Sequence, residues 1–348
     1  MGDLIGQATQ LAGNAVRVGW YTGVNWLAAR EGSRHATAAP FRPSRPVPSQ
    51  RELLDDLGEL MRRDAELVRD RFAPADGAAP AAGLFDHLSR LAAMLRDVPD
   101  AVGRRETRNA STVASFADLS EVPEYFRQDF HFQKGGYLAE DSARLYDVQV
   151  ETLFYGSAAA MRRAALRPIG EFLRGRDQRR SSLLDIACGT GRLLRDIRLV
   201  YPALRLTGLD LSPSYLSEAR RHLGGLRPAT LLAANAEAIP LDDASQDIVT
   251  CVFLFHELPP EVRRTVAREM ARVLKPGGLL VLVDSLQMGD RPGWDGLLEA
   301  FPHRFHEPYF RHYAIDDLDA LLSEAGLAAA ATSTAFLAKI MVRRKNTQ

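Results

Sequence analysis

The chain has 348 residues, of which 46% are hydrophobic and 25% are charged, with 44 basic and 44 acidic side chains. This composition is typical of a globular protein, and the length predicts about two domains at roughly 100 to 200 residues each. A formal net charge of +0 gives no reason to expect a nucleic acid as the partner.

The two cysteines and the lack of long apolar runs restrict the compartment. Cys188 and Cys251 are far apart and form no CxxC pair, which excludes a disulfide framework and a zinc ribbon. No run reaches the roughly 18 apolar residues of a transmembrane helix, and the N-terminus lacks the basic start of a secretion signal. We therefore expect a cytoplasmic protein whose N-terminus is retained.

Residues 1–50 are expected to form an amphipathic helix and a proline-rich arm. Apolar residues recur there at three- and four-residue steps: Leu4, Ala8, Leu11, Ala15 and Val18. This spacing predicts a helix with one apolar face, which must be covered by the protein's own core, by a second subunit in a homodimer or by a membrane surface. Four prolines within residues 32–50 predict a linker.

Residues 51–140 are expected to form a helical lid or oligomerisation region. Leucines at helical spacing predict one helix that ends before Pro74 and a second that stops by Pro99: Leu53, Leu57, Leu60 and Leu67, then Leu84, Leu88, Leu91 and Leu95. Residues 100–136, rich in aromatic side chains, predict loops and short helices. A helical pattern resumes over residues 142–173, with breaks at Gly156 and near Pro168.

Residues 141–348 show the alternation of a doubly wound α/β domain. From Ser182 onward, short apolar runs alternate with helical segments, beginning with LLDIA and LLRDIRLV. This pattern is typical of a parallel sheet with helices on both faces. The last two apolar runs, near residues 327–332 and 336–342, are expected to finish the sheet as an antiparallel pair.

Polar residues and glycines follow three successive predicted strands. LLDIACGTG places Asp185 on the first strand and Gly189 and Gly191 in the turn after it, where glycine lets a ligand approach the backbone closely. Asp210 ends the second strand, about 20 residues further on, where a carboxylate can accept hydrogen bonds from ribose hydroxyls. Residues 233–237 end the third strand. The order predicts a nucleoside site at the carboxyl edge of the sheet.

These segments, together with REMARVLKPGGLLVLVDS, resemble the class I S-adenosylmethionine-dependent methyltransferases. The sequence is especially similar to the ubiquinone and menaquinone methyltransferase-like branch, which acts on small molecules. The resemblance covers residues 142–342 and implies a Rossmann-like, seven-stranded methyltransferase sheet preceded by an additional all-helical region. It also implies S-adenosylmethionine as cofactor, S-adenosylhomocysteine as product and a small-molecule acceptor.

The resemblance implies a set of cofactor-binding residues. The methionine part would lie at Asp185 and at the turn formed by Ala187, Cys188, Gly189, Thr190 and Gly191. The ribose would lie at Asp210, and the adenine would lie beside Leu211, Asn235, Ala236 and Glu237. The inner edge would be lined by Cys251, Val252 and Phe253, and Tyr146 would cover the cofactor from a lid helix. Ala187 departs from the family's usual first glycine.

His256 and Glu257, in FLFHELPP, are the candidate catalytic residues because they follow the fourth strand. The segment begins like the zinc motif HExxH, but Pro259 and Pro260 follow and the second histidine is missing, which excludes zinc at this motif. His256 either contacts the substrate or transfers a proton, or it is a loop histidine bonded to backbone. Glu257 is either catalytic or a cap or ion-pair partner.

The acceptor site is expected after the fifth strand. Candidate substrate-binding residues lie there, in the run FPHRFHEPYFRHY and in the aromatic segment before residue 140: Tyr137, His256, Asp284, His303, His306, Tyr309 and Tyr313. His303, His306, Glu307 and His312 are not expected to bind a metal, since prolines interrupt the run. The run either roofs an apolar pocket or packs in the core. The same alternatives apply to Phe130, His131, Phe132 and Tyr137.

The sequence predicts an S-adenosylmethionine-dependent methyltransferase that acts on a small, partly apolar metabolite. Three other classes remain as alternatives: an enzyme of this fold that binds the cofactor without consuming it, a nicotinamide-dependent oxidoreductase, and a binding or scaffold protein. Leu194 stands where the GxGxxG turn of a nicotinamide site has its last glycine, which favours the methyltransferase.

Overall fold

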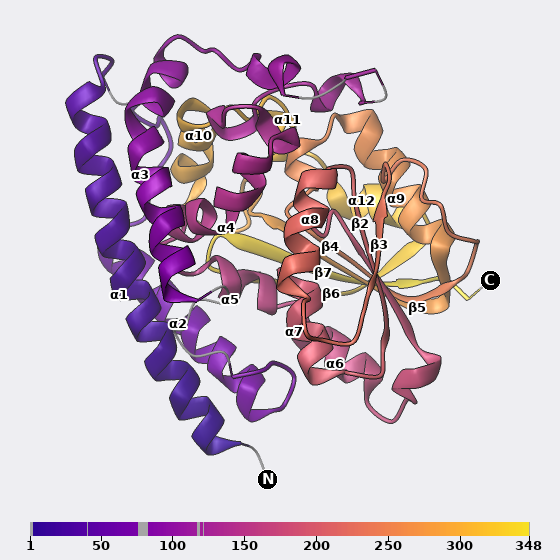
Figure 1. Cartoon of the computed structure of the whole chain (residues 1–348). Coiled ribbons are helices and arrows are strands. Elements are labelled where there is room, and N and C mark those ends of the chain that lie inside the picture. The colour runs from indigo at the N-terminus through magenta and orange to yellow at the C-terminus, as the bar shows by residue number, and fades with distance from the viewer. Residues whose placement is uncertain (1–2, 40, 76–82, 117–118, 121, 348) are drawn as a thin grey trace.

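A computed structural model describes residues 3–39, 41–75, 83–116, 119–120 and 122–347 (Figure 1). Seven strands form one sheet in the order β3-β2-β1-β4-β5-β7-β6. Their bounds are β1 Ser182–Ile186, β2 Arg205–Asp210, β3 Thr230–Ala233, β4 Gln246–Val252, β5 Leu274–Ser285, β6 Leu327–Ala335 and β7 Ala338–Lys345. The first five strands are parallel, and β7 is antiparallel to both β5 and β6. The predicted seven-stranded sheet with its final antiparallel pair is confirmed.

The strand order reverses at β1, which lies between β2 and β4. All five residues of β1 are buried, as expected for a central strand covered on both faces. In doubly wound folds, ligands bind outside the carboxyl ends of the strands at such a reversal. The chain therefore presents a ligand-binding edge where β1 and β2 end.

The helices of this α/β part follow the predicted alternation. They are α6 Leu166–Leu173, α7 Arg192–Val200, α8 Pro213–His222, α9 Pro260–Val273 and α12 Leu318–Glu324, with α10 Asp295–Arg304 and α11 Phe310–Tyr313 inserted between β5 and β6. Local sequence explains where they begin. Ser212, for example, caps α8 by accepting from the amide of Tyr215, and Pro213 follows in the first helical turn.

The N-terminal region is helical, as predicted. It contains α1 Leu4–His35, α2 Gln50–Arg69 and α3 Leu84–Glu106, the short helices η1 Thr112–Ser115, η2 Glu124–Phe126, η3 Phe130–Phe132 and η4 Gly136–Leu138, and then α4 Glu140–Leu153 and α5 Ala158–Arg163. Figure 1 shows α1, α2 and α3 lying together on one side of the sheet. The division of the chain at residues 50 and 140 stays a prediction.

The predicted stop of the second helix at Pro99 is wrong, since α3 continues through this proline to Glu106. A proline inside a helix removes one backbone hydrogen bond. The helix nevertheless buries Val102 beyond the proline. Packing of the continued apolar face outweighs the lost bond. Residues 76–82, within the predicted loop of residues 74–83, lie outside the described residues.

The apolar face predicted for α1 is not covered by the protein's own core, which leaves the second subunit and the membrane surface as predictions. Leu4 and Leu11 are 69% and 40% exposed. The buried side of the helix consists instead of Gly6, Gln10, Gly13, Asn14, Tyr21 and Val24. Within the described part of the chain, no helix has the length and apolarity needed to cross a membrane.

A buried carboxylate explains why the polar side of α1 faces inward. Asp64 of α2 accepts hydrogen bonds from the side-chain amides of Gln10, at 2.7 Å, and Asn14, at 3.0 Å. Its second oxygen lies 2.8 Å from the Arg163 guanidinium of α5. Buried polar groups require such partners. Asp64 therefore holds α1, α2 and α5 together within the helical layer.

Candidate active site

The turn between β1 and α7 brings backbone to the ligand-binding edge. Ala187, Gly189 and Gly191 all have positive φ, at 54°, 53° and 73°. A Cβ on Gly191 would lie 2.9 Å from the Cβ of Ala219, so close helix packing requires this glycine. A Cβ on Gly189 would meet only Tyr215, at 3.9 Å. The backbone at Gly189 thus faces open space that a ligand can enter.

Asp210, at the end of β2, lies directly beside this turn. Its carboxylate accepts hydrogen bonds from the amides of Gly189, at 2.8 Å, and Ser212, at 2.9 Å. Burial raises the pKa of Asp210 to about 6, although these amides oppose the shift. The two bonds orient the carboxylate, whose remaining lone pairs can accept from a ligand hydroxyl.

A cavity of about 100 Å³, here called the strand-end cavity, opens at this edge. Predicted cofactor, catalytic and substrate residues line it: Tyr137, Tyr146, Ala187, Gly189, Asp210, Leu211, Asn235, Ala236, Val252, Phe253 and Glu257. The structure therefore brings together residues from β1, β2, β3, β4 and the helical layer, as the order of the motifs predicted.

The other predicted cofactor residues lie behind these walls. Asp185 accepts a hydrogen bond from the Thr250 hydroxyl at 2.7 Å, and burial raises its pKa to about 7. The Thr190 hydroxyl donates to Asp147, and Glu237 accepts from Tyr125. Cys188, Gly191 and Cys251 do not line the strand-end cavity either. These residues support the walls from behind.

An aromatic lid closes the strand-end cavity and consists of Phe126, Phe130, Tyr137, Tyr146 and Tyr215. The rings of Phe130 and Tyr137 stack with centroids 5.3 Å apart, and Tyr215 meets Tyr137 and Tyr146 edge-on at 5.5 and 5.3 Å. Such arrangements favour packing beyond simple burial. The aromatic segment before residue 140 signalled this lid, but Tyr215 was missed because only the fold places it there.

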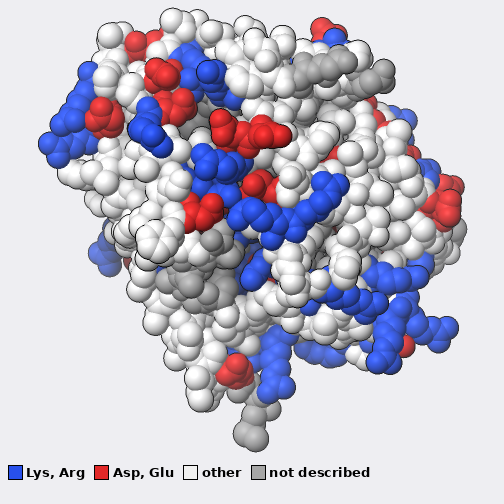
Figure 2. All heavy atoms as spheres, viewed as in Figure 1, with Lys and Arg blue, Asp and Glu red and all other residues white. Residues whose placement is uncertain are grey.

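A second, larger cavity of about 590 Å³ lies among α1, α3, α4, α5 and α7 and shares Tyr146 as a wall. Arg162 lines this cavity. Burial raises the pKa of Asp185, and the positive charge of Arg162 opposes this rise with a smaller effect. Outside this cavity, acidic and basic side chains are intermixed over α3 and α8 (Figure 2). Arg90, for example, pairs with both Asp86 and Glu218.

His256 is held in a buried ion pair. Its Nδ1 lies 2.6 Å from a carboxylate oxygen of Asp284, whose other oxygen accepts from the amide of Phe255. Burial lowers the pKa of His256, but the Asp284 carboxylate outweighs burial and raises it to about 10. His256 is therefore protonated at neutral pH, which favours orientation of neighbouring groups over abstraction of a proton.

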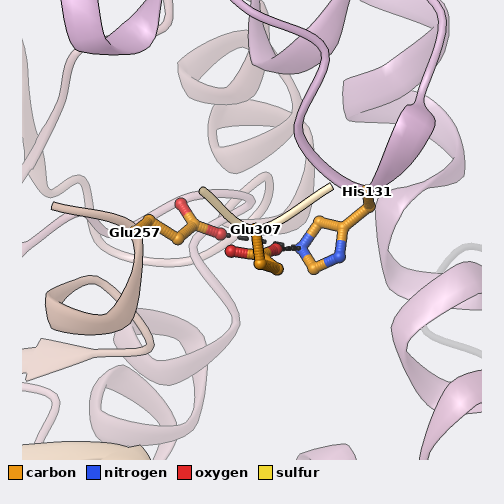
Figure 3. A group of neighbouring side chains, drawn as sticks. All are labelled: His131, Glu257 and Glu307. Atoms are coloured by element: carbon orange, nitrogen blue, oxygen red, sulfur yellow. Dashed lines mark ion pairs between the residues drawn. The ribbon is translucent and has the colours of Figure 1, made fainter. Parts of the chain in front are cut away.

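Glu257 belongs to a second cluster at the same end of the cavity. Its carboxylate accepts a hydrogen bond from the Tyr137 hydroxyl. The Nε2 atom of His131 lies 3.6 Å from this carboxylate and 3.0 Å from that of Glu307 (Figure 3). Burial raises the pKa of Glu307. For His131, burial lowers the pKa, but Glu307 and Glu257 outweigh it and the net shift is upward.

The remaining predicted substrate residues do not line either cavity. His303 stacks on Phe41 with ring centroids 3.7 Å apart. His306 pairs with the side-chain oxygen of Gln128 at 2.7 Å, and its carbonyl accepts from the amide of His131. Tyr309 packs against the aromatic lid, and the Tyr313 hydroxyl donates to the carbonyl of Ser285. The insertion after β5 therefore contributes Glu307 to the cluster with His131 and Glu257.

The α/β part is similar to known methyltransferases. A family profile described as a methyltransferase domain matches residues 183–278. A demethylmenaquinone methyltransferase of Listeria welshimeri is 35% identical over 138 residues, which cover 39% of this chain and 57% of that protein. A ubiquinone/menaquinone biosynthesis C-methyltransferase of Methylobacterium nodulans is 33% identical over 165 residues, or 47% and 63% of the two chains.

Residues 183–278 therefore match the methyltransferase domain family, and the seven-stranded sheet that contains them has the class I methyltransferase architecture. S-adenosylmethionine is the cofactor of this family. The similarity spans less than two thirds of the length of either relative. Among solved structures, a methyltransferase from Aquifex aeolicus matches with a TM-score of 0.40 and 19% identity, covering 52% of this chain and 89% of that one.

Proposed function

We propose that the protein transfers a methyl group from S-adenosylmethionine to a small, partly apolar metabolite. The observation that carries this proposal is the position of Asp210. Its carboxylate is oriented by the Gly189 amide at the edge of a lidded cavity, inside the residues that match the methyltransferase profile.

The residues of the site suit each part of the cofactor. Asp210 accepts from the ribose hydroxyls, and the apolar walls at Leu211 and Ala236 suit the adenine. Asp185 supplies a negative charge for the methionine ammonium. The Nε of Arg162 is buried without a hydrogen-bond partner among the described residues, and it supplies a positive charge for the carboxylate.

When bound, S-adenosylmethionine supplies a methyl group already activated by its sulfonium. The protein therefore has to orient the acceptor and exclude water, and good orientation can supply up to about 7 to 11 kcal/mol. The aromatic lid serves both purposes. Phe130 is only 1% exposed, and Tyr137 and Tyr215 close the cavity above Gly189.

The acceptor is expected to combine an apolar body with one polar group. Val252, Phe253 and Leu254 make the acceptor end of the cavity apolar, whereas Glu257 brings a carboxylate into the same wall. A quinone-like or phenolic ring with an oxygen substituent has this chemistry. The names of the two relatives are consistent with this class.

The first experiment is calorimetry and thermal unfolding of the full chain with S-adenosylmethionine, S-adenosylhomocysteine and NAD. Binding of the two sulfur nucleosides and not of NAD is expected, with stabilisation of about 2.7 kcal/mol at 100 times the dissociation constant. Incorporation of labelled methyl into a quinol or phenol panel then tests transfer. Binding of NAD alone would overturn the proposal, and cofactor binding without consumption would favour the non-methylating alternative.

A further inference from the structure

We propose that His131, Glu257 and Glu307 bind a divalent transition-metal ion such as Zn²⁺ or Mn²⁺ at the acceptor end of the strand-end cavity. The binding itself is independent of the proposed function. Only the suggested use of the ion, to hold an oxygen of the acceptor, rests on methyl transfer.

The three side chains converge from separate segments of the chain. His131 lies in η3, Glu257 ends the short helix η6 (Phe255–Glu257), and Glu307 lies just before α11. One ligand atom from each lies within 4.8 Å of the other two, and Figure 3 shows the imidazole and both carboxylates pointing toward one another. An ion at about 2.0 to 2.2 Å from each atom requires ligand separations near 3 to 3.5 Å. The Nε2 atom of His131 lies 3.0 Å from the Glu307 carboxylate and 3.6 Å from the Glu257 carboxylate, close to these separations.

The state of Glu307 is the second and independent observation. Its side chain is fully buried, and neither carboxylate oxygen has a hydrogen-bond partner among the described residues. Its close neighbour is the Nε2 atom of His131, toward which it points. Buried carboxylates are normally hydrogen-bonded, paired or bound to a metal, because leaving water is costly. An ion bound in the cluster would give the buried Glu307 carboxylate the partner that it lacks.

The charges around the cluster favour a dication. The neighbouring His256 and Asp284 form their own ion pair, so they add no net charge. If His131 presents its neutral Nε2 lone pair, Glu257 and Glu307 remain with two negative charges. The two carboxylates therefore neutralise the two charges of the ion. The Tyr137 hydroxyl donates a hydrogen bond to Glu257 and so would orient this ligand from outside the coordination shell.

The donor types select the class of ion. One imidazole and two carboxylates suit Zn²⁺, Mn²⁺ or Co²⁺, whereas Mg²⁺ and Ca²⁺ prefer oxygen ligands alone. Three protein ligands leave at least one coordination position free. Because Glu257 also lines the strand-end cavity, that position is accessible to an oxygen of the acceptor. These three ligands do not form an HExxH motif, and that motif is incomplete in the sequence.

The test uses the full chain after chelator treatment. Co²⁺ is titrated while its visible absorption is recorded, and Zn²⁺ and Mg²⁺ are compared by calorimetry. One equivalent of Co²⁺ or Zn²⁺ should bind, and Mg²⁺ should bind far more weakly. Glu307→Gln and His131→Ala should weaken Co²⁺ binding by at least the roughly 10- to 100-fold that loss of an outer-shell partner costs.

The matched controls are Glu324→Gln and His35→Ala, which change exposed residues of the same types away from the cluster. Both should bind Co²⁺ like the unmodified protein. S-adenosylhomocysteine binding by each variant shows that its cofactor site is folded, and Glu257→Gln replaces any variant that fails this check. Absence of one-equivalent binding, or unchanged binding by a folded cluster variant, would overturn the metal site. Metal binding without methyl transfer would overturn only the proposed function.

Discussion

The cofactor end and the acceptor end of the site are built in different ways. The cofactor end uses the carboxyl ends of β1, β2 and β3, and its central contact joins Asp210 to Gly189, only 21 residues away. The acceptor end joins His131 to Glu257 and Glu307 across more than a hundred residues and from three separate segments of the chain. The first depends on local strand-to-helix turns, and the second depends on how the helical layer and the β5–β6 insertion pack.

The largest expected effect is a loss of folding stability when a buried contact of the helical layer is removed. Asp64→Ala removes the carboxylate that pairs with Arg163 and holds α1, and loss of one partner of a buried pair costs about 3 to 5 kcal/mol. Thermal and urea unfolding should show a loss of this size. Asp55→Ala, which changes an exposed carboxylate of the same helix, should leave stability nearly unchanged. Equal small losses in both variants would show that the helical layer does not depend on Asp64.

Asp210→Ala should break the cofactor end while the acceptor end stays folded. It removes the acceptor of the Gly189 and Ser212 amides and, in the proposed site, the acceptor of the ribose hydroxyls. We expect affinity for S-adenosylhomocysteine to fall by about 100-fold, or roughly 2.7 kcal/mol, in calorimetry. Asp141→Ala, an exposed carboxylate at the start of α4, serves as the control. Retained affinity in the Asp210 variant would reject the placement of the ribose.

His256→Ala should affect turnover more than cofactor affinity. His256 forms its ion pair with Asp284 and lies 3.8 Å from Glu257, so it acts as a positioning residue for the acceptor end. We expect kcat to fall by about tenfold, with a rise in the KM for the acceptor and an unchanged dissociation constant for S-adenosylhomocysteine. His256→Gln, which can still bond to Asp284, should recover part of the rate. A rate equal to that of the unmodified protein would reduce His256 to a structural role.

The smallest effect concerns pH and the cofactor end alone. Burial raises the pKa of Asp210 to about 6 and that of Asp185 to about 7, so both carboxyls are partly protonated in the free protein below neutral pH. Ribose hydroxyls and an ammonium favour the ionised carboxylates. Affinity for S-adenosylhomocysteine should therefore rise at least about tenfold between pH 5 and 7 and level off above pH 8. Calorimetry across this range should show that the affinity of Asp210→Asn depends less steeply on pH. An unchanged pH dependence would show that a group other than Asp210 titrates.

Several features of the fold were predictable because their signals are local. The alternation of apolar runs predicted the strands, and the turn after Asp185 predicted a ligand-binding edge, which the structure places where β1 ends. Strand ends in a parallel sheet meet at one edge, so the position of Asp210 followed from its place in the sequence. The resemblance to the methyltransferases then assigned the cofactor.

Features that depend on partners far along the chain were not predictable. Helical spacing correctly predicted α1, but the side facing inward is decided by Asp64, a residue of another helix. The end of α3 depends on the burial of Val102, and the histidine-rich insertion places His303 against Phe41, outside both cavities.

The sequence by itself determined the α/β fold, the resemblance to methyltransferases and the position of Asp210 at the carboxyl edge of the sheet, because periodicity and short turns depend on neighbouring residues. Only the tertiary structure decided which polar groups meet at the acceptor end. His131 is separated from Glu307 by 176 positions, yet its imidazole lies 3.0 Å from that carboxylate. Contacts of this kind arise from the packing of whole elements, which no local pattern encodes.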